Sequence, residues 1–340
     1  MIITRTPYRI SFFGGGTDYP AWYNEHGGAV LATSINRYCY ITCRYLPPFF
    51  EHKHRIVYSI IEDVKTVEEI KHPAARESLK YMQITEGLEI HHDGDLPARA
   101  GLGSSSAFTV GLLHALHALR GEMRSRLQLA QEAIHVERNM IGENVGSQDQ
   151  TAASFGGLNM IQFTQGDHIT IHPVTVKAER ITQVHSHLLL YFTGFSRTAS
   201  EIAADQIRNT PNKTKELHAL RAMVDEAVTI LCGNNDIGDF GRLLHEGWKI
   251  KRSLSTKISN SYLDDIYTKA QQAGALGGKL LGAGGGGFML FFVPPDQQAH
   301  FRDQMAPLLH VPFEFESLGT QIIFYEPSTD EAGIAASRPY

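Results

Sequence analysis

The stretch Leu96-Pro97-Ala98-Arg99-Ala100-Gly101-Leu102-Gly103-Ser104-Ser105-Ser106-Ala107-Phe108 is typical of a glycine-rich loop that leads directly into a helix. Gly101 and Gly103 let the backbone approach a ligand closely and adopt conformations closed to other residues. The serines offer hydroxyls and helix-capping oxygens, and the apolar run that follows favours a helix. The first-turn N–H groups of a helix are unsatisfied and its dipole places partial positive charge there, so a nucleotide phosphate is the natural occupant. The simpler alternative is an ordinary capped helix after a flexible turn.

Two helices are expected immediately after this loop. Residues 108–119 carry an apolar face that is typical of a buried helix. A second helix starts at Ser125, where Gln128 completes a capping box, and runs to about Ile141. The region after the loop is therefore predicted to be helical and largely buried.

Two acidic residues in this region each have two possible roles. Glu137 lies late on the second helix among apolar residues, where it is either a metal ligand in a cleft or half of an ion pair. The pattern favours the ion pair, with Arg138 or Arg99 as the partner. Asp149 lies at the start of a short predicted helix over 150–155, where it is a helix cap or, if held near a phosphate, a general base.

The chain before the loop is predicted to form mainly strands. Residues 2–13 alternate in character and predict a strand that ends on three glycines. Thr17 and Asp18 follow at once and could bind substrate hydroxyls, because a carboxylate accepts hydrogen bonds from OH groups. The alternative, which the pattern favours, is a glycine turn with Asp18 as a local cap. Further strands are expected over 29–46, 55–61 and 88–92, and a helix over 72–82.

The predicted secondary structure changes near Val184, in the second half of the chain. A hairpin precedes this point, and one strand followed by a largely helical region comes after it. We therefore expect two domains, residues 1–185 and 186–340. The expected elements are a hairpin over 158–163 and 168–176, a strand over 188–192, and helices over about 198–209, 213–231 and 236–252.

A second glycine loop, Lys279-Leu280-Leu281-Gly282-Ala283-Gly284-Gly285-Gly286-Gly287-Phe288, occurs late in the chain. Gly282, Gly284 and Gly287 match the dinucleotide-binding pattern, but the apolar run from Phe288 predicts a strand, whereas that motif must open a helix. No Gly-x-x-x-x-Gly-Lys-Ser/Thr sequence is present, so a P-loop is excluded as well. The remaining interpretation is a turn between a helix and a strand. Its backbone would approach the nucleotide side of the cleft that contains the first glycine-rich loop.

Composition limits the classes of partner. The 340 residues carry 31 Lys and Arg against 36 Asp and Glu, a net charge of −5, so nucleic acid is not expected as a partner. No apolar run is long enough to cross a bilayer, and the first residues lack a signal-peptide pattern. We therefore expect a cytoplasmic protein with no membrane partner. The oligomeric state cannot be inferred from the sequence.

The three glycine-containing motifs, in this order, resemble those of the GHMP small-molecule kinases, the superfamily of galactokinase, homoserine kinase, mevalonate kinase and phosphomevalonate kinase. The motifs lie at Thr6–Tyr19, Leu96–Ala107 and Lys279–Phe288, so the resemblance covers nearly the whole chain. Within the superfamily, Thr6–Ile10 leading to Gly14–Asp18, with the later Gly146–Gln150 and Phe155–Gly157, looks most like the D-glycero-D-manno-heptose 7-phosphate kinases.

The resemblance implies an α+β fold and a set of residue roles. The fold would combine an N-terminal domain like domain 2 of ribosomal protein S5 with a ferredoxin-like C-terminal domain, and the active site would lie between them. Asp149 would either take the proton from the attacking hydroxyl or only orient that hydroxyl. Arg9 would lie beside Asp149 and keep its carboxylate ionised. Ser105 and Glu137 would hold Mg²⁺. The residues implied to bind ATP are Arg99, Gly101, Leu102, Gly103, Ser104, Ser105 and Ser106, and those of the closing glycine loop are Gly282, Gly284, Gly285 and Gly286.

The resemblance also implies the acceptor, a sugar phosphate, with ATP as the donor. In its first motif galactokinase carries a glutamate and a histidine directly before the Thr-Asp pair. This chain has Gly15 and Gly16 there, which leaves space for a bulkier, phosphorylated sugar. A sugar phosphate needs cationic partners, although any single one of the candidates is more simply explained as a solvated surface charge. The alternatives are a kinase of galactose, fucose, mannose or mevalonate, and a catalytically silent sugar and ATP sensor. The residues expected to bind the acceptor are Gly15, Gly16, Thr17, Asp18, Arg197, Lys251 and Arg252.

Overall fold

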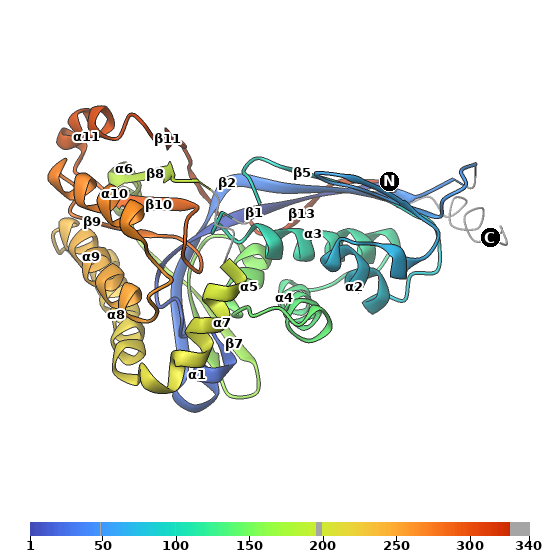
Figure 1. The fold of residues 1–340 in the computed structure, drawn as a ribbon, viewed down its shortest axis with the longest axis horizontal. Coiled ribbons are helices and arrows are strands. Elements are labelled where there is room, and N and C mark those ends of the chain that lie inside the picture. Colours follow the sequence, from blue (N-terminus) through green and yellow to red (C-terminus); the bar gives the residue numbers. More distant parts are fainter. Residues whose placement is uncertain (48, 99, 195–198, 327–340) are drawn as a thin grey trace.

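The first of two β-sheets forms the long body of the molecule (Figure 1). The computed structural model describes residues 1–47, 49–98, 100–194 and 199–326. Among these residues nine strands form the first sheet, whose main path runs β13-β1-β2-β5-β3-β4, while β6 and β12 pair with β2 and β7 pairs with β6. The strands are β1 (Ile2–Phe13), β2 (Gly28–Tyr45), β3 (His54–Val57), β4 (Ile61–Val64), β5 (Leu88–Gly94), β6 (Leu158–Thr164), β7 (His168–Pro173), β12 (Phe315–Glu316) and β13 (Gln321–Tyr325).

The central strand β1 has two different halves. Its first four residues alternate between buried and half-buried positions, as expected for a strand covered on one face. From Thr6 to Phe13 every residue is buried, including the polar Arg9 and Ser11. This second half is covered on both faces, and Arg9 and Ser11 line the cavity described below.

Helices cover one face of the first sheet (Figure 1). The helix α3 packs against β1 and β2, and Gly111 allows the close approach, because a Cβ there would lie 2.8 Å from the Thr6 hydroxyl. The predicted capping box at Ser125 and Gln128 is confirmed, and the second helix continues as one π-helical segment, Val136–Ile141. The helices associated with this sheet are α1 (Pro20–His26), α2 (Pro73–Tyr81), α3 (Ser104–Leu119), α4 (Arg126–His135) and α5 (Gln148–Phe155).

The second sheet is antiparallel, in the order β11-β8-β10-β9, and lies at the other end of the molecule (Figure 1). The helix α9 contacts β9 and β10 of this sheet and also β1 of the first sheet. The aromatic ring of Phe240 on α9 packs edge-on against Phe12 and Phe13, with centroids 5.4 and 5.2 Å away, so one hydrophobic core joins the two sheets. The elements are α6 (Ala178–His187), β8 (Leu188–Phe192), α7 (Ala199–Asn209), α8 (Thr214–Cys232), α9 (Gly238–Ser253), α10 (Ser261–Gln272), β9 (Gly277–Leu280), β10 (Phe288–Phe292), α11 (Gln298–Gln304) and β11 (Leu309–His310), with short 3-10 turns at Val67–Glu69, Thr210–Asn212 and Pro295–Gln297.

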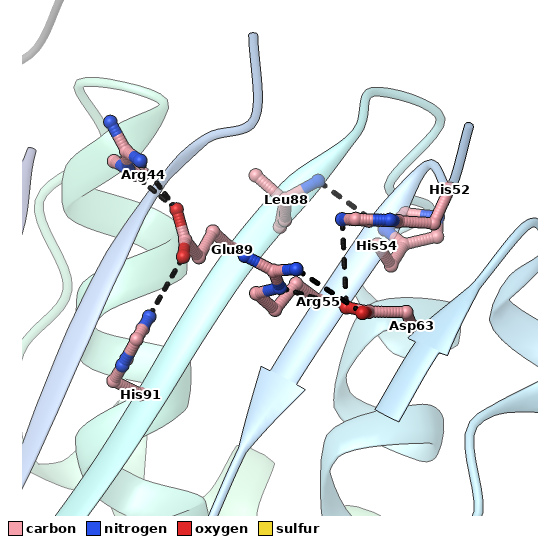
Figure 2. A network of polar contacts seen from close by, with 8 residues as sticks. All are labelled: Arg44, His52, His54, Arg55, Asp63, Leu88, Glu89 and His91. Carbon is pink, nitrogen blue, oxygen red and sulfur yellow. Dashed lines mark hydrogen bonds and ion pairs between the residues drawn. The ribbon is translucent and has the colours of Figure 1, made fainter. Parts of the chain in front are cut away.

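The single strand predicted over 55–61 is wrong. The chain forms a hairpin there instead, β3 and β4, because the segment reverses at 58–60. A hydrogen bond ties the hairpin to β5 (Figure 2), because the Leu88 N–H donates to His54 Nδ1 at 3.4 Å. Within the hairpin Arg55 donates to Asp63, and beside it Glu89 on β5 accepts from Arg44 on β2 at 2.6 and 2.8 Å. Burial alone would raise the pKa of Glu89, but hydrogen bonds from His91 and Arg44 outweigh it and lower that pKa.

The overall class agrees with the expected α+β fold of two sheets with helices. The last strands, β12 and β13, return to the first sheet and pair with β2 and β1. The division of the chain into two domains between residues 185 and 186 stays a prediction. No helix within the described part of the chain is both long and apolar enough to span a bilayer.

Candidate active site

A cavity of about 400 Å³ lies where the second sheet and its helices meet the first sheet. Its lining comes from four places: the end of β1 and the glycines after it, the loop that opens α3, the loop before α5, and the elements α7, α9 and β9 with the glycine loop that follows. The cavity therefore gathers residues that are up to 274 positions apart, from Arg9 to Ala283. Most of the residues singled out in the sequence line it.

Arg9 and Asp149 form a bidentate ion pair in this cavity. Arg9 Nε donates to Asp149 Oδ1 and Nη2 donates to Oδ2, both at 2.8 Å. The third guanidinium nitrogen, Nη1, donates to the Gly101 carbonyl at 2.7 Å. Arg9 is almost fully buried, whereas a quarter of the Asp149 side chain is exposed to the cavity. The arginine thus orients the carboxylate and ties it to the loop that opens α3.

The loop 101–106 presents glycines and serines to the cavity. Gly101, Gly103 and the three serines that follow line it, and α3 begins at Ser104 without a side-chain cap from Gly103. Leu102 does not line the cavity: its side chain is buried in the core and its carbonyl accepts from the Arg9 N–H at 3.0 Å. Leu102 therefore has a structural role. Arg99 lies outside the described residues.

Glu137 is fully buried directly behind this loop. Its Oε2 accepts from the Ser106 hydroxyl at 2.9 Å and from the Gln150 amide at 2.5 Å. Its Oε1 accepts no hydrogen bond of good geometry among the described residues, although the Thr109 hydroxyl lies near enough to the carboxylate to lower its pKa. Burial raises the pKa of Glu137 to about 7, against the lowering effect of its hydrogen bonds. The predicted ion pair with Arg138 is wrong, because Arg138 donates instead to Asp167 and Ser147.

The oxygen ligands around Glu137 suit a hard cation such as Mg²⁺. A buried carboxylate oxygen without a partner is costly, and a nearby cation would satisfy it. The serine that contacts Glu137 is Ser106, whereas Ser105 lies exposed at the cavity lining. No group of three or more His, Cys, Asp or Glu within the described ranges could bind a metal by itself. A cation here would be shared with substrate phosphates, which is the usual mode for Mg²⁺.

The glycines after β1 form another wall of the cavity. Gly15, Gly16 and Asp18 line it, and Asp18 Oδ1 accepts from the Gly16 N–H at 3.0 Å. Burial raises the pKa of Asp18, and the neighbouring Asp149 adds to that effect. The prediction that Thr17 binds the acceptor is wrong, because Thr17 does not line the cavity. Its buried hydroxyl bonds to the Gly14 and Ala29 carbonyls and holds the turn in place.

Two lysines from the second part of the chain line the cavity. Lys251 on α9 is buried and donates to the Gly282 carbonyl, and Lys279 on β9 donates to the Ser11 and Phe12 carbonyls at 2.8 Å each. Arg252 does not line it, because its side chain points away and pairs with Asp264 at 2.8 Å. Arg197 lies outside the described residues.

The late glycine loop packs against the loop that opens α3. A Cβ on Gly101 would lie 2.4 Å from the Leu281 carbonyl oxygen, and one on Gly287 would lie 2.3 Å from that of Ala100. The Phe288 N–H donates to the Ala100 carbonyl at 3.1 Å. Of the expected closing residues, Gly282 lines the cavity, whereas Gly284, Gly285 and Gly286 do not.

The sequence reasoning missed Lys279, Ser11 and Gln206 as members of the site. Ser11 follows Arg9 by two positions and so lies on the same strand face, which is a usable signal. Gln206 is one polar residue in a polar helix and carries no such signal.

Two family models match the chain. Residues 65–157 match the GHMP kinases N terminal domain and residues 220–307 match the GHMP kinases C terminal domain. Together they span more than half of the sequence, and the cavity contains residues from both matched regions. The chain belongs to the GHMP kinases. It is accordingly a phosphotransferase, and GHMP kinases use ATP.

Relatives in this family include sugar kinases and mevalonate kinases. The chain is 28% identical over 313 residues to a D-glycero-alpha-D-manno-heptose 7-phosphate kinase of Campylobacter jejuni, covering 87% of this chain and 91% of the relative. It is 26% identical over 336 residues to a galactokinase of Pyrococcus furiosus, covering 87% and 90%. A crystal structure of a D-glycero-D-manno-heptose 1-phosphate kinase from Bacteroides thetaiotaomicron has the same fold, with a TM-score of 0.77 at 24% identity, covering 94% of this chain and 98% of that one.

Proposed function

We propose that this enzyme transfers the γ-phosphoryl group of ATP to the anomeric hydroxyl of D-glycero-D-manno-heptose 7-phosphate and forms the 1,7-bisphosphate. The observation that carries the proposal is the bidentate Arg9–Asp149 pair facing the glycine-serine loop in one cavity. Phosphoryl transfer needs a positioned nucleophile and stabilised phosphate charge, and these residues can provide both. The heptose relative from Campylobacter jejuni supports the choice of acceptor.

In the proposed reaction, Asp149 accepts the hydrogen bond and finally the proton of the anomeric hydroxyl. The hydroxyl oxygen forms a bond to the γ-phosphorus while the bond to the β–γ bridging oxygen breaks, which releases ADP. Arg9 holds the Asp149 carboxylate in place and offsets the negative charge that develops on the attacking oxygen. The N–H groups of the first turn of α3 and the serine hydroxyls bind the phosphates. A Mg²⁺ ion held by Glu137 with Ser105 or Ser106 would neutralise phosphate charge.

The other end of the cavity would bind the heptose phosphate. Asp18 is buried there as a hydrogen-bond acceptor for sugar hydroxyls, and Gly15, beside which a Cβ would meet nothing within 4 Å, leaves room for a large sugar. Lys251 and Lys279 place two buried amino groups at the same end. Two nearby amino groups favour an acceptor that carries its own phosphate over a neutral sugar. The product would then be used for nucleotide-activated heptose in capsule or lipopolysaccharide synthesis in the cytoplasm.

The test is phosphorus NMR of the purified protein with ATP, Mg²⁺ and, in separate samples, the heptose 7-phosphate, mannose, galactose and mevalonate. We expect a new anomeric phosphate signal only with the heptose 7-phosphate, and its coupling would identify the anomer. Asp149→Asn is expected to lower kcat by at least about a hundredfold, since a positioned base or orienting group contributes that much.

Other outcomes would replace the proposal. Turnover of galactose or mevalonate would keep the family assignment and discard the heptose phosphate. No turnover in any sample, with ATP and sugar still bound, would favour a silent sensor. Equal ADP release by Asp149→Asn and the unmutated protein would remove Asp149 from the mechanism.

A further inference from the structure

Three residues that line the cavity carry a buried polar atom without a hydrogen-bond partner among the described residues. Gln148 Oε1 is an acceptor, whereas the amide nitrogen Nε2 of Gln206 and the hydroxyl of Ser11 can donate. Gln206 and Ser11 are each only 5% exposed. Buried polar groups in folded proteins are nearly always paired, so two unpaired donors in a single cavity point to a ligand that accepts hydrogen bonds from them.

The fold aims both side chains into the cavity. Gln206 and Ala203 are three residues apart on α7, hence on one helix face, and both line the cavity. Gly16 makes room for the Gln206 amide, because a Cβ on Gly16 would lie 2.7 Å from Nε2. The backbone of Ser11 is held in place by Lys279, whose amino group donates to the Ser11 carbonyl at 2.8 Å.

The surrounding chemistry identifies the group that these atoms would bind. An amide N–H donates only, a hydroxyl can donate, and the amino groups of Lys251 and Lys279 line the same cavity. Such a set of donors fits a group with several acceptor oxygens and negative charge. The ATP phosphates belong at the loop that opens α3, so this second set of donors is left for the acceptor molecule.

We propose that Gln206 and Ser11 are specificity-determining residues that hydrogen-bond the phosphate group carried by the acceptor sugar. This inference rests on the proposed function, since it requires a phosphorylated acceptor. Gln206 comes from the second part of the chain and Ser11 from the first sheet, so binding of the phosphate would bridge the two.

The test compares Gln206→Leu and Gln206→Glu with the unmutated enzyme, using D-glycero-D-manno-heptose 7-phosphate and the same heptose without its phosphate. Gln206→Leu keeps the approximate size of the side chain and removes the donor, and we expect KM for the heptose 7-phosphate to rise roughly 10- to 100-fold, the range for a lost hydrogen bond to a charged group. Gln206→Glu places a carboxylate against the phosphate, so its KM should rise further. KM for ATP should stay within about twofold in both variants, as should any turnover of the unphosphorylated heptose.

One control and one further test variant complete the experiment. Gln131→Leu makes the same substitution on the exposed side of α4 and should leave every constant unchanged. Ser11→Ala removes the second unpaired donor and should raise KM for the heptose 7-phosphate alone, with the thermal midpoint of unfolding used to check folding. Gln206 would then have been tested with and without a change of charge, and Ser11 without one.

The outcomes separate this inference from the proposed function. If the heptose 7-phosphate is phosphorylated but its KM is unchanged in Gln206→Leu and Ser11→Ala, the inference is overturned and the proposed function stands. If the variants raise KM for ATP equally, these residues do not discriminate the acceptor and the inference is also overturned. Turnover of an unphosphorylated sugar alone would overturn both.

Discussion

A lysine amino group that is buried beside an arginine loses part of its preference for the charged form, and Lys251 is in this situation. Burial and, to a smaller extent, the positive charge of Arg9 lower the pKa of Lys251 to about 8, against the opposing effect of Asp18 and Asp149. The side chain is thus mostly charged at neutral pH and mostly neutral about two pH units above it. A single residue can therefore make acceptor binding depend on pH.

The prediction at this scale is that kcat/KM for the heptose 7-phosphate falls above pH 8. The sign follows because a lysine is positive below its pKa, so raising the pH through about 8 removes the charge that attracts the phosphate. We expect a fall of about tenfold per pH unit until the neutral-lysine level is reached.

Steady-state kinetics between pH 6.5 and 9.5 would measure this fall, and two variants provide the comparison. In Lys251→Arg the fall should move to higher pH, since a guanidinium stays charged. Lys251→Met should give a low kcat/KM without this step. An identical profile in Lys251→Met would remove Lys251 from acceptor binding.

At the scale of elements, the two glycine loops support each other's backbone. Gly101 lies against Leu281 and Gly282, and Gly287 lies against Ala100, at distances that leave no room for a Cβ. Because Arg9 also donates to the Gly101 carbonyl, the same contact supports the Arg9–Asp149 pair. The late glycine loop thus shapes the phosphate-binding loop from behind, although only part of it reaches the cavity.

The prediction for this element compares Gly101→Ala with Gly121→Ala. Both glycines have positive φ, +87° and +71°, so each alanine should cost roughly 1–2 kcal/mol of backbone strain. Only at Gly101 would the new Cβ also clash with backbone, whereas nothing lies within 4 Å at Gly121.

We expect Gly101→Ala to lose about 1–3 kcal/mol more unfolding free energy than Gly121→Ala. It should also raise KM for ATP at least tenfold, while Gly121→Ala leaves that constant unchanged. Urea unfolding and ATP kinetics would measure the two effects. Equal losses in both variants would mean that the loop contact contributes nothing beyond backbone strain.

At the scale of the whole molecule, the cavity exists because the second sheet is joined to the first. Lys279 on β9 is one such connection, since its buried amino group bonds to the Ser11 and Phe12 carbonyls of β1. Burial lowers the pKa of Lys279 well below its ordinary value. The connection therefore depends on two hydrogen bonds rather than on an ion pair with a carboxylate.

The prediction at this scale is that Lys279→Met destabilises the protein by about 1–3 kcal/mol, because it leaves two buried carbonyls without this donor. Lys249→Met is the control, as Lys249 is exposed on α9 and its amino group pairs with Glu246 on the same helix. Urea unfolding in the absence of ligands would measure both. A loss no larger than that of Lys249→Met would show that Lys279 does not help to join the sheets.

Local patterns account for what could be predicted and what could not. Strand alternation and helix capping are properties of neighbouring residues, so β1, β8 and the helix start at Ser125 could be predicted from the sequence. The turn inside 55–61 has no glycine or proline, so its hairpin was missed. The roles of Thr17 and Arg252 were misjudged because a side chain's direction depends on the surfaces that pack around it.

The amino-acid sequence by itself determined the class of the protein, through three glycine motifs whose order and spacing indicate a GHMP kinase. It also determined which charged residues were available for the chemistry, above all Arg9, Glu137 and Asp149. Only the tertiary structure decided which of them meet: Arg9 reaches Asp149 across 140 positions, and Glu137 turns to Ser106 and away from Arg138. The physical reason is that hydrogen bonds and ion pairs act over a few ångströms, and the packing of distant segments sets those distances.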